Sequence, residues 1–248
     1  MLERNTFGEL KRSEGPTASP AERSVLASFE LFEDVDPRLL PVIEQSGRYR
    51  RFSAQEQIVD RAAPSTEVFF IVSGRVRVVA YSMSGREITF DDLSAGQYFG
   101  EIAAIDGGPR SAGVMAVEDA VVLALPRRQF LSVLADHPQV ALRVMLRLAR
   151  IVRVANERIM DLSTLAANNR VQAELLRQAR SDGTMRNTAI IQPIPVHSEI
   201  ASRVSTTRET VARVLNELSR RGIVERTRTA LIIRDVPRLQ TMVEEVRG

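Results

Sequence analysis

Residues 99–112, which read FGEIAAIDGGPRSA, place a carboxylate, a guanidinium and a hydroxyl close together in the chain. A guanidinium, a hydroxyl and consecutive backbone N–H groups can together hold one phosphate, because all of them donate hydrogen bonds. A carboxylate such as Glu101 can accept a hydrogen bond from a sugar hydroxyl. The segment is therefore a candidate site for one sugar phosphate, with Arg110 and Ser111 on the phosphate. On the residues alone, a Glu101–Arg110 ion pair beside a Gly-Gly-Pro turn is the simpler explanation.

Residues 197–222, which read HSEIASRVSTTRETVARVLNELSRRG, have the pattern of two short helices joined by a tight turn. Thr206 and Glu209 form a capping box, which predicts the start of the second helix, and Gly222 marks its end. This helix is predicted to be apolar on one face and polar or small on the other. The apolar face carries Val211, Val214, Leu215 and Leu218. The opposite face carries Arg208, Glu209, Ala212, Arg213 and Asn216.

The polar face of the second helix has the chemistry to read bases in the major groove of DNA. An arginine can donate two hydrogen bonds to guanine, a carboxylate can accept one from cytosine, and the helix N-terminus favours phosphate. The segment GIVERTRTALIIRD that follows has the pattern of a two-stranded wing, whose turn arginines can contact phosphates. The alternative is that Glu209 serves only the capping box and that the arginines are solvated. The predicted DNA-binding residues are His197, Ser198, Thr207, Arg208, Glu209, Arg213, Arg226 and Arg228.

The distribution of charge agrees with a DNA-binding C-terminal third. Residues 167–248 contain 14 arginines against 9 acidic residues, whereas the rest of the chain contains 20 basic and 22 acidic residues. Lys11 is the sole lysine, so nearly all of the positive charge is guanidinium, which forms forked hydrogen bonds with phosphate and guanine. The base composition of the gene is an alternative explanation for the preference for arginine.

Other classes of function find little support in the composition. The chain has no cysteine and only two histidines, His137 and His197, which argues against disulfides, iron–sulfur clusters, metal sites and haem. We find no nucleophile–base arrangement and no dinucleotide-binding fingerprint in the sequence, so we expect no enzymatic activity. No apolar run approaches the roughly 20 residues of a membrane span, and the N-terminus lacks a secretory pattern, so we expect a cytoplasmic protein.

The elements that must position these motifs begin with a β-rich segment. Residues 1–24 show no periodicity and are predicted to be a mobile arm. A short helix is predicted at residues 37–45, with Asp36 as its cap and Pro37 at its first position. Between residues 48 and 125, short β-type runs alternate with turn residues, which predicts a barrel or sandwich. The runs are VFFIVS, RVRVVAYS, REITFDDL, SAGVMAV and AVVLALP.

A long helix is predicted over residues 138–166. Its apolar and small residues recur at alternating spacings of four and three, which is typical of a coiled-coil seam. We therefore expect the helix to pair with its copy in a second chain, with packing on its own domain as the alternative. Asn168 and Asn169 are predicted to break the chain before a further helix over residues 170–180. The seam residues are Ala141, Met145, Leu148, Val152, Ala155, Ile159, Leu162 and Ala166.

The second helix of the C-terminal pair resembles a known DNA reader. The segment TTRETVARVLNEL is similar to the recognition helix of the CRP/FNR family of bacterial transcription regulators, in its cyclic AMP receptor protein branch. In that branch an R-E-x-x-x-R arrangement reads a GTGA half-site. The resemblance carries this role to Arg208, Glu209 and Arg213.

The candidate phosphate site resembles the phosphate-binding cassette of cyclic-nucleotide domains in the same family. The resemblance assigns the ribose 2′-hydroxyl to Glu101 and the cyclic phosphate to Arg110 and Ser111. It implies a cyclic nucleotide as effector, with cyclic AMP as first choice and cyclic GMP as second, and no cofactor. The predicted ligand-binding residues are Val78, Phe99, Gly100, Glu101, Ile102, Ala103, Arg110, Ser111, Ala112, Ala155 and Asn156.

The resemblance implies an α+β fold in four parts. Residues 1–24 are the arm, residues 25–137 an N-terminal β-roll (a cyclic-nucleotide-binding jelly roll), residues 138–167 a long central dimerisation helix, and residues 168–248 a C-terminal winged helix-turn-helix. The implied partners are a second copy of the chain, a double-stranded DNA operator with a TGTGA-like inverted repeat, and RNA polymerase, with no membrane. Half-sites read by a symmetric dimer lie about 34 Å apart.

The sequence departs from the family pattern where the base of the nucleotide is recognised. Ala155 stands where the family has a threonine that bonds adenine, and Ile151 stands where it has an arginine. Asn156 stands where a serine reaches over from the partner subunit, and its amide offers both a donor and an acceptor to adenine or guanine. Asn156 as a solvated residue beside the seam remains an alternative. A DNA regulator that needs no ligand or answers to a different effector is the second hypothesis, and a regulatory subunit of a kinase or channel, opposed by the helix-turn-helix, is the third.

Overall fold

The computed structural model describes residues 24–83, 85–181, 184–185 and 187–247. The mobile arm predicted for residues 1–24 lies, apart from Ser24, outside these residues. Among the described residues, no helix combines the length and the apolar character that crossing a bilayer requires.

Two four-stranded antiparallel sheets form the β-roll, with strand orders β1-β8-β3-β6 and β2-β7-β4-β5. Apolar side chains of both sheets, such as Phe69, Val76 and Val122, meet in one buried cluster, as alternation of apolar and polar residues along the strands predicts. The strands are β1 (Arg48–Phe52), β2 (Gln57–Val59), β3 (Val68–Ser73), β4 (Arg75–Tyr81), β5 (Glu87–Ser94), β6 (Tyr98–Phe99), β7 (Gly113–Ala116) and β8 (Ala120–Leu125). The predicted β-roll is confirmed.

Short helices from both ends of the N-terminal domain pack on the sheet that contains β3 and β8. These are η2 (Val25–Ser28), η3 (Glu30–Phe32), α1 (Leu40–Gln45) and α3 (Arg127–Asp136). The prediction that α1 begins at Pro37 with Asp36 as its cap is wrong, because the helix begins at Leu40. Asp36 instead closes the preceding turn, where its Oδ1 accepts a hydrogen bond from the backbone N–H of Arg38 at 2.9 Å.

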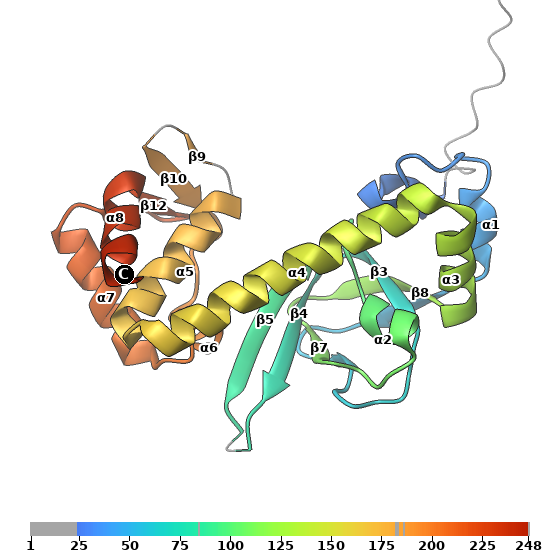
Figure 1. The fold of residues 1–248 in the computed structure, drawn as a ribbon, viewed down its shortest axis with the longest axis horizontal. Helices are drawn as coiled ribbons and strands as arrows, with labels where there is room; N and C mark the ends of the chain where they lie inside the picture. Colours follow the sequence, from blue (N-terminus) through green and yellow to red (C-terminus); the bar gives the residue numbers. More distant parts are fainter. Residues whose placement is uncertain (1–23, 84, 182–183, 186, 248) are drawn as a thin grey trace, which may run out of the picture.

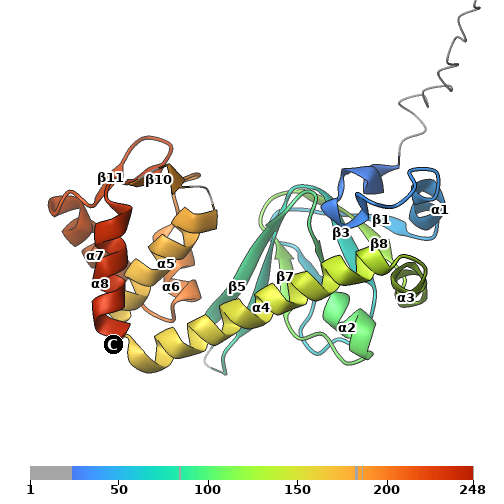
Figure 2. The same ribbon diagram turned by 45° about the horizontal axis from the view of Figure 1, so that its top comes forward.

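The long helix α4 (Pro138–Thr164) runs from the β-roll to the C-terminal domain, and the β4–β5 hairpin extends beside it (Figure 1, Figure 2). Val140 and Val144 are buried in the core of the N-terminal domain, and Leu148 packs against the same core. Leu148 is half-buried there, as the alternative of packing on its own domain predicts for this position. Met145, Val152 and Ile159, in contrast, are each more than half exposed, so this part of the predicted seam lies on the surface of the single chain.

The C-terminal domain begins at α5 (Ala167–Ser181) and packs its helices on a small four-stranded sheet. The predicted break at Asn168 and Asn169 is wrong: both lie in α5, and the helices separate at the extended residue Leu165. The predicted two-stranded wing is part of a sheet with the order β11-β12-β10-β9. The other elements are β9 (Thr184–Met185), β10 (Thr188–Ile191), α6 (His197–Arg203), α7 (Arg208–Arg220), β11 (Val224–Arg226), β12 (Leu231–Ile233) and α8 (Val236–Arg247).

Candidate functional site

The predicted phosphate cassette begins where β6 ends at Phe99 and α2 (Glu101–Asp106) starts. Gly100 precedes α2 with a φ of 91°, a conformation that residues with a side chain rarely adopt. A Cβ at this position would also lie 2.5 Å from Nη1 of Arg110 and 2.8 Å from the carbonyl oxygen of Glu67. Glycine is therefore required here so that the backbone can pass close to the arginine, and Glu101 enters the first turn of α2 with its side chain buried.

Arg110 is buried, and its guanidinium is held in one orientation by Gly100 of the cassette and by the segment around the start of β3. Its Nε donates to Oγ of Ser65 at 3.0 Å, its Nη2 to the carbonyl oxygen of Glu67 at 2.8 Å and its Nη1 to that of Gly100 at 3.2 Å. The guanidinium also lies over the ring of Phe69, 5.4 Å from its centre. These contacts use three of the five N–H donors of an arginine, which leaves donors for an anion. Ser111, the next residue, is exposed, so its hydroxyl is accessible beside the arginine.

Glu101 forms its ion pair with Arg147 of α4, so the simple Glu101–Arg110 ion pair of the sequence analysis is wrong. Nε of Arg147 lies 3.7 Å from Oε1 of Glu101, and its Nη2 donates to the carbonyl oxygen of Tyr98 at 2.8 Å. Burial raises the pKa of Glu101, whereas the positive charge of Arg147 works against this rise. The arrangement joins the cassette to the central helix.

Arg147 was missed in the sequence analysis. The one signal for Arg147 in the sequence is its position. It lies one helical turn before Ile151, where the resemblance expects an arginine. The spacing alone does not show that the side chain reaches the cassette, because the contact joins residues 46 positions apart.

The structure brings most of the predicted ligand-binding residues together around β6, α2 and the loop before β7. Val78 lies on β4, paired with Val114 of β7, where it packs against the core of the roll. Phe99 and Ala103 are buried, whereas Ile102 and Ala112 are half-buried. These residues suit a sugar phosphate because Glu101 supplies a buried carboxylate, Arg110 a fixed guanidinium and Ser111 an accessible hydroxyl.

Ala155 and Asn156 are not part of that group, because they lie exposed on α4. Arg147 and Arg158 mark the side of α4 that faces the β-roll, since Nη1 of Arg158 donates to the carbonyl oxygen of Phe90 at 2.6 Å. A helix turns about 100° per residue, so Asn156 lies about 180° around the helix from Arg147. Asn156 therefore points away from the cassette of its own chain.

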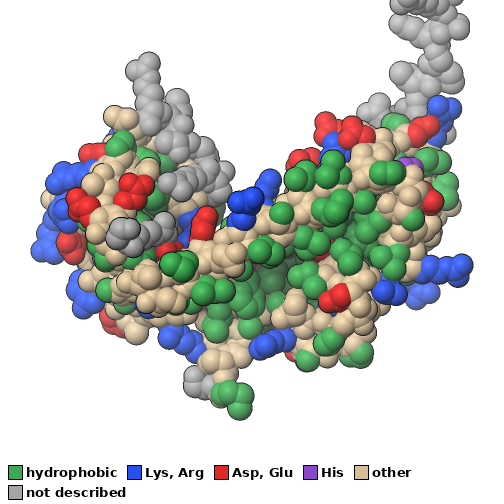
Figure 3. Space-filling model, viewed as in Figure 1, with side chains coloured by type: hydrophobic (Ala, Val, Ile, Leu, Met, Phe, Trp, Pro, Cys, Tyr) green, Lys and Arg blue, Asp and Glu red, His purple; other side chains and the backbone are tan. Residues whose placement is uncertain are grey.

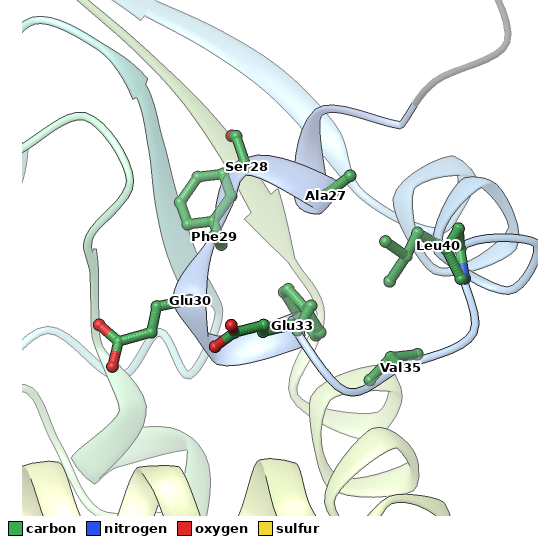
Figure 4. A pocket seen from close by; sticks show the side chains of 9 residues that line it. Ala27, Ser28, Phe29, Glu30, Glu33, Val35 and Leu40 are labelled. Atoms are coloured by element: carbon green, nitrogen blue, oxygen red, sulfur yellow. The ribbon is translucent and has the colours of Figure 1, made fainter.

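A surface hollow lies elsewhere in the N-terminal domain, among η2, η3 and the start of α1 (Figure 4). Phe29, Glu30 and Glu33 are among the residues that line it, and none of the predicted ligand-binding residues is. The hollow is therefore separate from the cassette.

In the C-terminal domain, the start of α7 differs from the prediction by one residue. Thr207 is the cap, and its Oγ1 accepts a hydrogen bond from the backbone N–H of Thr210 at 3.3 Å. The predicted capping box of Thr206 and Glu209 is wrong, because Thr206 precedes the cap. Hydrogen bonds to its own backbone N–H and to the Thr207 hydroxyl lower the pKa of Glu209, which keeps this carboxylate charged and able to accept hydrogen bonds. The predicted helix end is confirmed, since Gly222 follows α7 with a φ of 69°.

The predicted two faces of α7 are confirmed by burial. Val211, Val214 and Leu218 are buried in the domain core, whereas the polar face is exposed. On that face are Arg208, Glu209, Arg213 and Asn216. Arginine side chains gather at the end of the molecule formed by the C-terminal domain (Figure 3).

The other predicted DNA-binding residues lie on α6 and in the wing. Arg226 ends β11 and Arg228 lies in the turn before β12, both exposed. His197 and Ser198 are the first two residues of α6. Nη2 of Arg213 makes a long contact of 3.4 Å with Oδ1 of Asn168, so it is held only weakly within the domain.

Comparisons with known proteins match both halves of the chain. Residues 49–137 match the cyclic nucleotide-binding domain family, and residues 169–242 match the Crp-like helix-turn-helix domain family. The chain is 37% identical over 158 residues to the cyclic AMP receptor protein of Thermus thermophilus, which covers 63% of this chain and 70% of that protein. It is 26% identical over 216 residues to the CRP-like cAMP-activated global transcriptional regulator of Mycobacterium tuberculosis, which covers 87% of this chain and 96% of that protein.

Solved structures share the fold. A mutant of CooA from Carboxydothermus hydrogenoformans matches with a TM-score of 0.73 and 25% identity, over 82% of this chain and 90% of that one. FixK2 from Bradyrhizobium japonicum matches with a TM-score of 0.67 and 23% identity, over 79% of this chain and 96% of that one. The matched domains and relatives are those of transcription regulators and not of enzymes.

Proposed function

The chain belongs to the CRP/FNR family of transcription regulators, and from this premise we propose that it is a homodimer in which a cyclic nucleotide controls the reading of an inverted DNA repeat. The observation that carries the proposal is the cassette, where Glu101 is buried at the start of α2 beside the fixed guanidinium of Arg110. The same chain presents an exposed polar face on α7. The chain thus carries both the proposed nucleotide site and the proposed DNA-binding face.

The ligand that suits the cassette is a 3′,5′-cyclic nucleotide. Arg110 and Ser111 would hold the cyclic phosphate, and Glu101 would accept from the ribose 2′-hydroxyl. The base is less defined, because Ala155 offers no hydroxyl. Asn156, which points away from its own cassette, would reach the base in the cassette of the second chain. Cyclic AMP is our first choice, in line with the names of the relatives, and cyclic GMP is the second.

The exposed apolar side chains of α4 support pairing with a second copy of the chain. Hydrophobic side chains extend along α4 on the face shown in Figure 3. Met145, Val152 and Ile159 follow one another at intervals of seven residues, which is the period of a two-stranded coiled coil. The two copies of α7 would then face successive turns of a TGTGA-like inverted repeat in the cytoplasm, with RNA polymerase as a further partner.

A second candidate is a regulator of the same family that needs no ligand or answers to another effector. The observation that favours it is Ala155, which removes one expected contact to an adenine base. Operator binding measured with and without nucleotide separates the two candidates, because only the first requires a response to nucleotide.

The proposed ligand site is tested by the substitution Arg110→Leu. We expect the loss of cyclic nucleotide binding in calorimetry and of nucleotide-dependent binding to a TGTGA inverted repeat in a gel-shift assay, because the main cation for the phosphate is removed. Arg128→Leu, at an exposed position on α3, is the control and should bind as the parent protein does. Unchanged nucleotide affinity in the Arg110→Leu protein would refute the assignment.

A further inference from the structure

Charged side chains of the β-roll and of the C-terminal domain meet around Asp92 of β5, where α6 packs against this strand. Nε and Nη2 of Arg77, on the neighbouring strand β4, donate to Oδ1 and Oδ2 of Asp92 at 2.7 and 3.0 Å. Nη2 of Arg203, at the end of α6, donates to the same Oδ2 at 2.7 Å. One carboxylate thus binds an arginine from each domain.

Two further contacts close the cluster. Nη2 of Arg77 crosses to the C-terminal domain and donates to Oε1 of Glu199 at 2.7 Å. Beside it, Oγ1 of Thr89 and Oγ of Ser202 share a hydrogen bond of 2.8 Å. We call Arg77, Asp92, Glu199 and Arg203 the interdomain cluster.

The interdomain cluster is sheltered from water. The side chains of Arg77 and Arg203 are each 13% exposed and that of Asp92 is 17% exposed. Burial works to raise the pKa of Asp92, but the hydrogen bonds and charges of Arg77 and Arg203 outweigh it and lower this pKa. Salt screens such sheltered pairs less than exposed ones, and forked arginine–carboxylate contacts fix relative orientation.

The cluster continues into α5. Nη1 of Arg203 lies 3.9 Å from Oε1 of the buried Glu174, which also pairs with Arg177. Nη2 of Arg177 donates to Oδ2 of Asp161, in the last turn of α4, at 2.9 Å. The contact therefore connects the β-roll, the end of α4 and the first two helices of the C-terminal domain.

This docked arrangement leaves the polar face of α7 uncovered. Arg208, Glu209 and Arg213 remain exposed while α6 is fixed on β5. The hairpin touches the chain just before α7, where Nη2 of Arg86 donates to the carbonyl oxygen of Thr206 at 2.6 Å. The β-roll thus holds the start of the proposed recognition helix without blocking it.

We propose that Asp92 is a positioning residue for DNA reading, which fixes the helix-turn-helix on the β-roll in the arrangement that binds DNA. The inference rests on the proposed DNA-binding function. Two recognition helices must meet two half-sites at the same time, and domains that are already fixed lose less conformational freedom on binding. Asp92 acts through Arg203 and α6, and does not itself contact DNA.

A cross-link tests whether the docked arrangement binds DNA. The chain has no cysteine, so the double substitution Thr89→Cys and Ser202→Cys introduces a single possible intramolecular disulfide where the two hydroxyls now touch. We expect the oxidised protein to bind the operator at least as tightly as the reduced protein. Loss of operator binding on oxidation, with recovery on reduction, would overturn the proposal.

The role of Asp92 is tested by Asp92→Asn. We expect operator affinity to fall by at least about tenfold, nonspecific DNA binding to change little, and the disulfide to restore operator affinity in the Asp92→Asn background. Asp136→Asn, which removes an exposed carboxylate that accepts a hydrogen bond from Ser132 at the end of α3, is the matched control. Unchanged operator affinity, or a loss that the disulfide does not restore, would contradict the proposal.

A measurement without DNA distinguishes failure of this inference from failure of the proposed function. Spin labels at Glu118→Cys in the β-roll and Ser219→Cys in α7, both exposed, report the distance between the domains. We expect a narrow distance distribution in the parent protein and a broad one after Asp92→Asn. Equally narrow distributions would refute the positioning role, whereas a parent protein that binds no operator would refute the proposed function instead. If Asp92→Asn does not fold, the cross-linked protein still tests whether the docked arrangement binds the operator.

Discussion

At the cassette, the size and the charge of single residues are closely constrained. Gly100 must lack a side chain because a Cβ would meet both the Arg110 guanidinium and a backbone carbonyl. Glu101 must remain charged although it is buried, because a protonated carboxyl loses part of its capacity to accept hydrogen bonds. Arg147 supplies the nearby positive charge, and it stacks on the ring of Tyr98, 4.5 Å from its centre. One charge on α4 thus supports the proposed contact with the ribose.

We predict that Arg147→Gln moves the pH dependence of cyclic nucleotide binding to higher pH. Burial already raises the pKa of Glu101, and removal of Arg147 removes the charge that opposes this rise. Ligand binding requires the charged carboxylate, so affinity should weaken as the pH falls, and at a higher pH in the variant than in the parent protein. Calorimetric titrations of the parent and the variant at a series of pH values measure this.

The same titrations include two controls, one with a changed ligand and one with a changed residue. A 2′-deoxy cyclic nucleotide, which lacks the hydroxyl assigned to Glu101, should lose most of the difference between the parent and the variant. Arg143→Gln, which removes an ion pair of α4 with Glu33 and Asp34 away from the cassette, should follow the parent profile. A variant profile parallel to that of the parent would contradict the role of Arg147.

On α7, we predict that Arg208→Ala and Arg213→Ala each weaken operator binding by about 1–3 kcal/mol, with little effect on nonspecific DNA. Both side chains are exposed, so the expected effect is loss of hydrogen bonds to base edges and not loss of packing. Fluorescence anisotropy with the operator and with a scrambled duplex measures both quantities. Arg221→Ala, at the far end of α7, is the control, and equal losses on both duplexes would argue against base reading.

Sequence motifs predict the residues that act locally and miss those that act across the fold. Glu101 and Arg110 lie within one short segment, so their types and spacing predict a shared site. The Arg147–Glu101 and Asp92–Arg203 contacts join residues 46 and 111 positions apart, and no local pattern records such pairs. The prediction of Thr206 as the cap of α7, where the structure has Thr207, is a smaller error, because adjacent threonines satisfy the same pattern.

Among the elements, α4 packs some of its apolar side chains on the N-terminal domain and leaves others exposed. Val140, Val144 and Leu148 pack on the N-terminal core in the first half of the helix. In the second half, apolar side chains remain exposed although each would gain by burial. The periodic spacing predicts the helix, but it does not distinguish a side chain that packs on its own domain, as Leu148 does in part, from one that is free to contact a second chain.

We predict that the double substitution Val152→Glu and Ile159→Glu raises the dimer dissociation constant by at least about 100-fold. Pairing would bury four added carboxylates without partners, which is strongly unfavourable. Sedimentation velocity measures the oligomeric state. Leu39→Glu, at a partly exposed position before α1, should leave it unchanged, and an equally dimeric double variant would show that α4 is not the interface.

Short elements of the C-terminal domain were the hardest to predict. The strands β9 and β10 contain two and four residues, too few for a clear alternation, and two prolines follow them. They are recognisable only through their pairing, β10 with β12 and β9 with β10, which turns the predicted wing into one edge of a larger sheet. By contrast, the longer α7 was predicted almost to the residue because its apolar and polar faces repeat over three turns.

At the scale of the whole molecule, the two domains are connected twice. The chain itself passes through α4 and the break at Leu165, and the interdomain cluster joins β5 to α6 through side chains. The first connection is the backbone itself, whereas the second adds side-chain hydrogen bonds between the two domains. We therefore expect the cluster to be the main route by which a ligand bound to the β-roll influences α6.

We predict that cyclic nucleotide slows amide hydrogen exchange in α6 as well as in the β-roll of the parent protein. A ligand that binds only the folded β-roll lowers the population of opened forms, and a domain fixed to that roll shares the protection. After Asp92→Asn, the added protection should be confined to the β-roll, whereas Asp136→Asn should behave as the parent. Equal protection of α6 with and without the Asp92 carboxylate would show that the coupling between the domains runs through α4 alone.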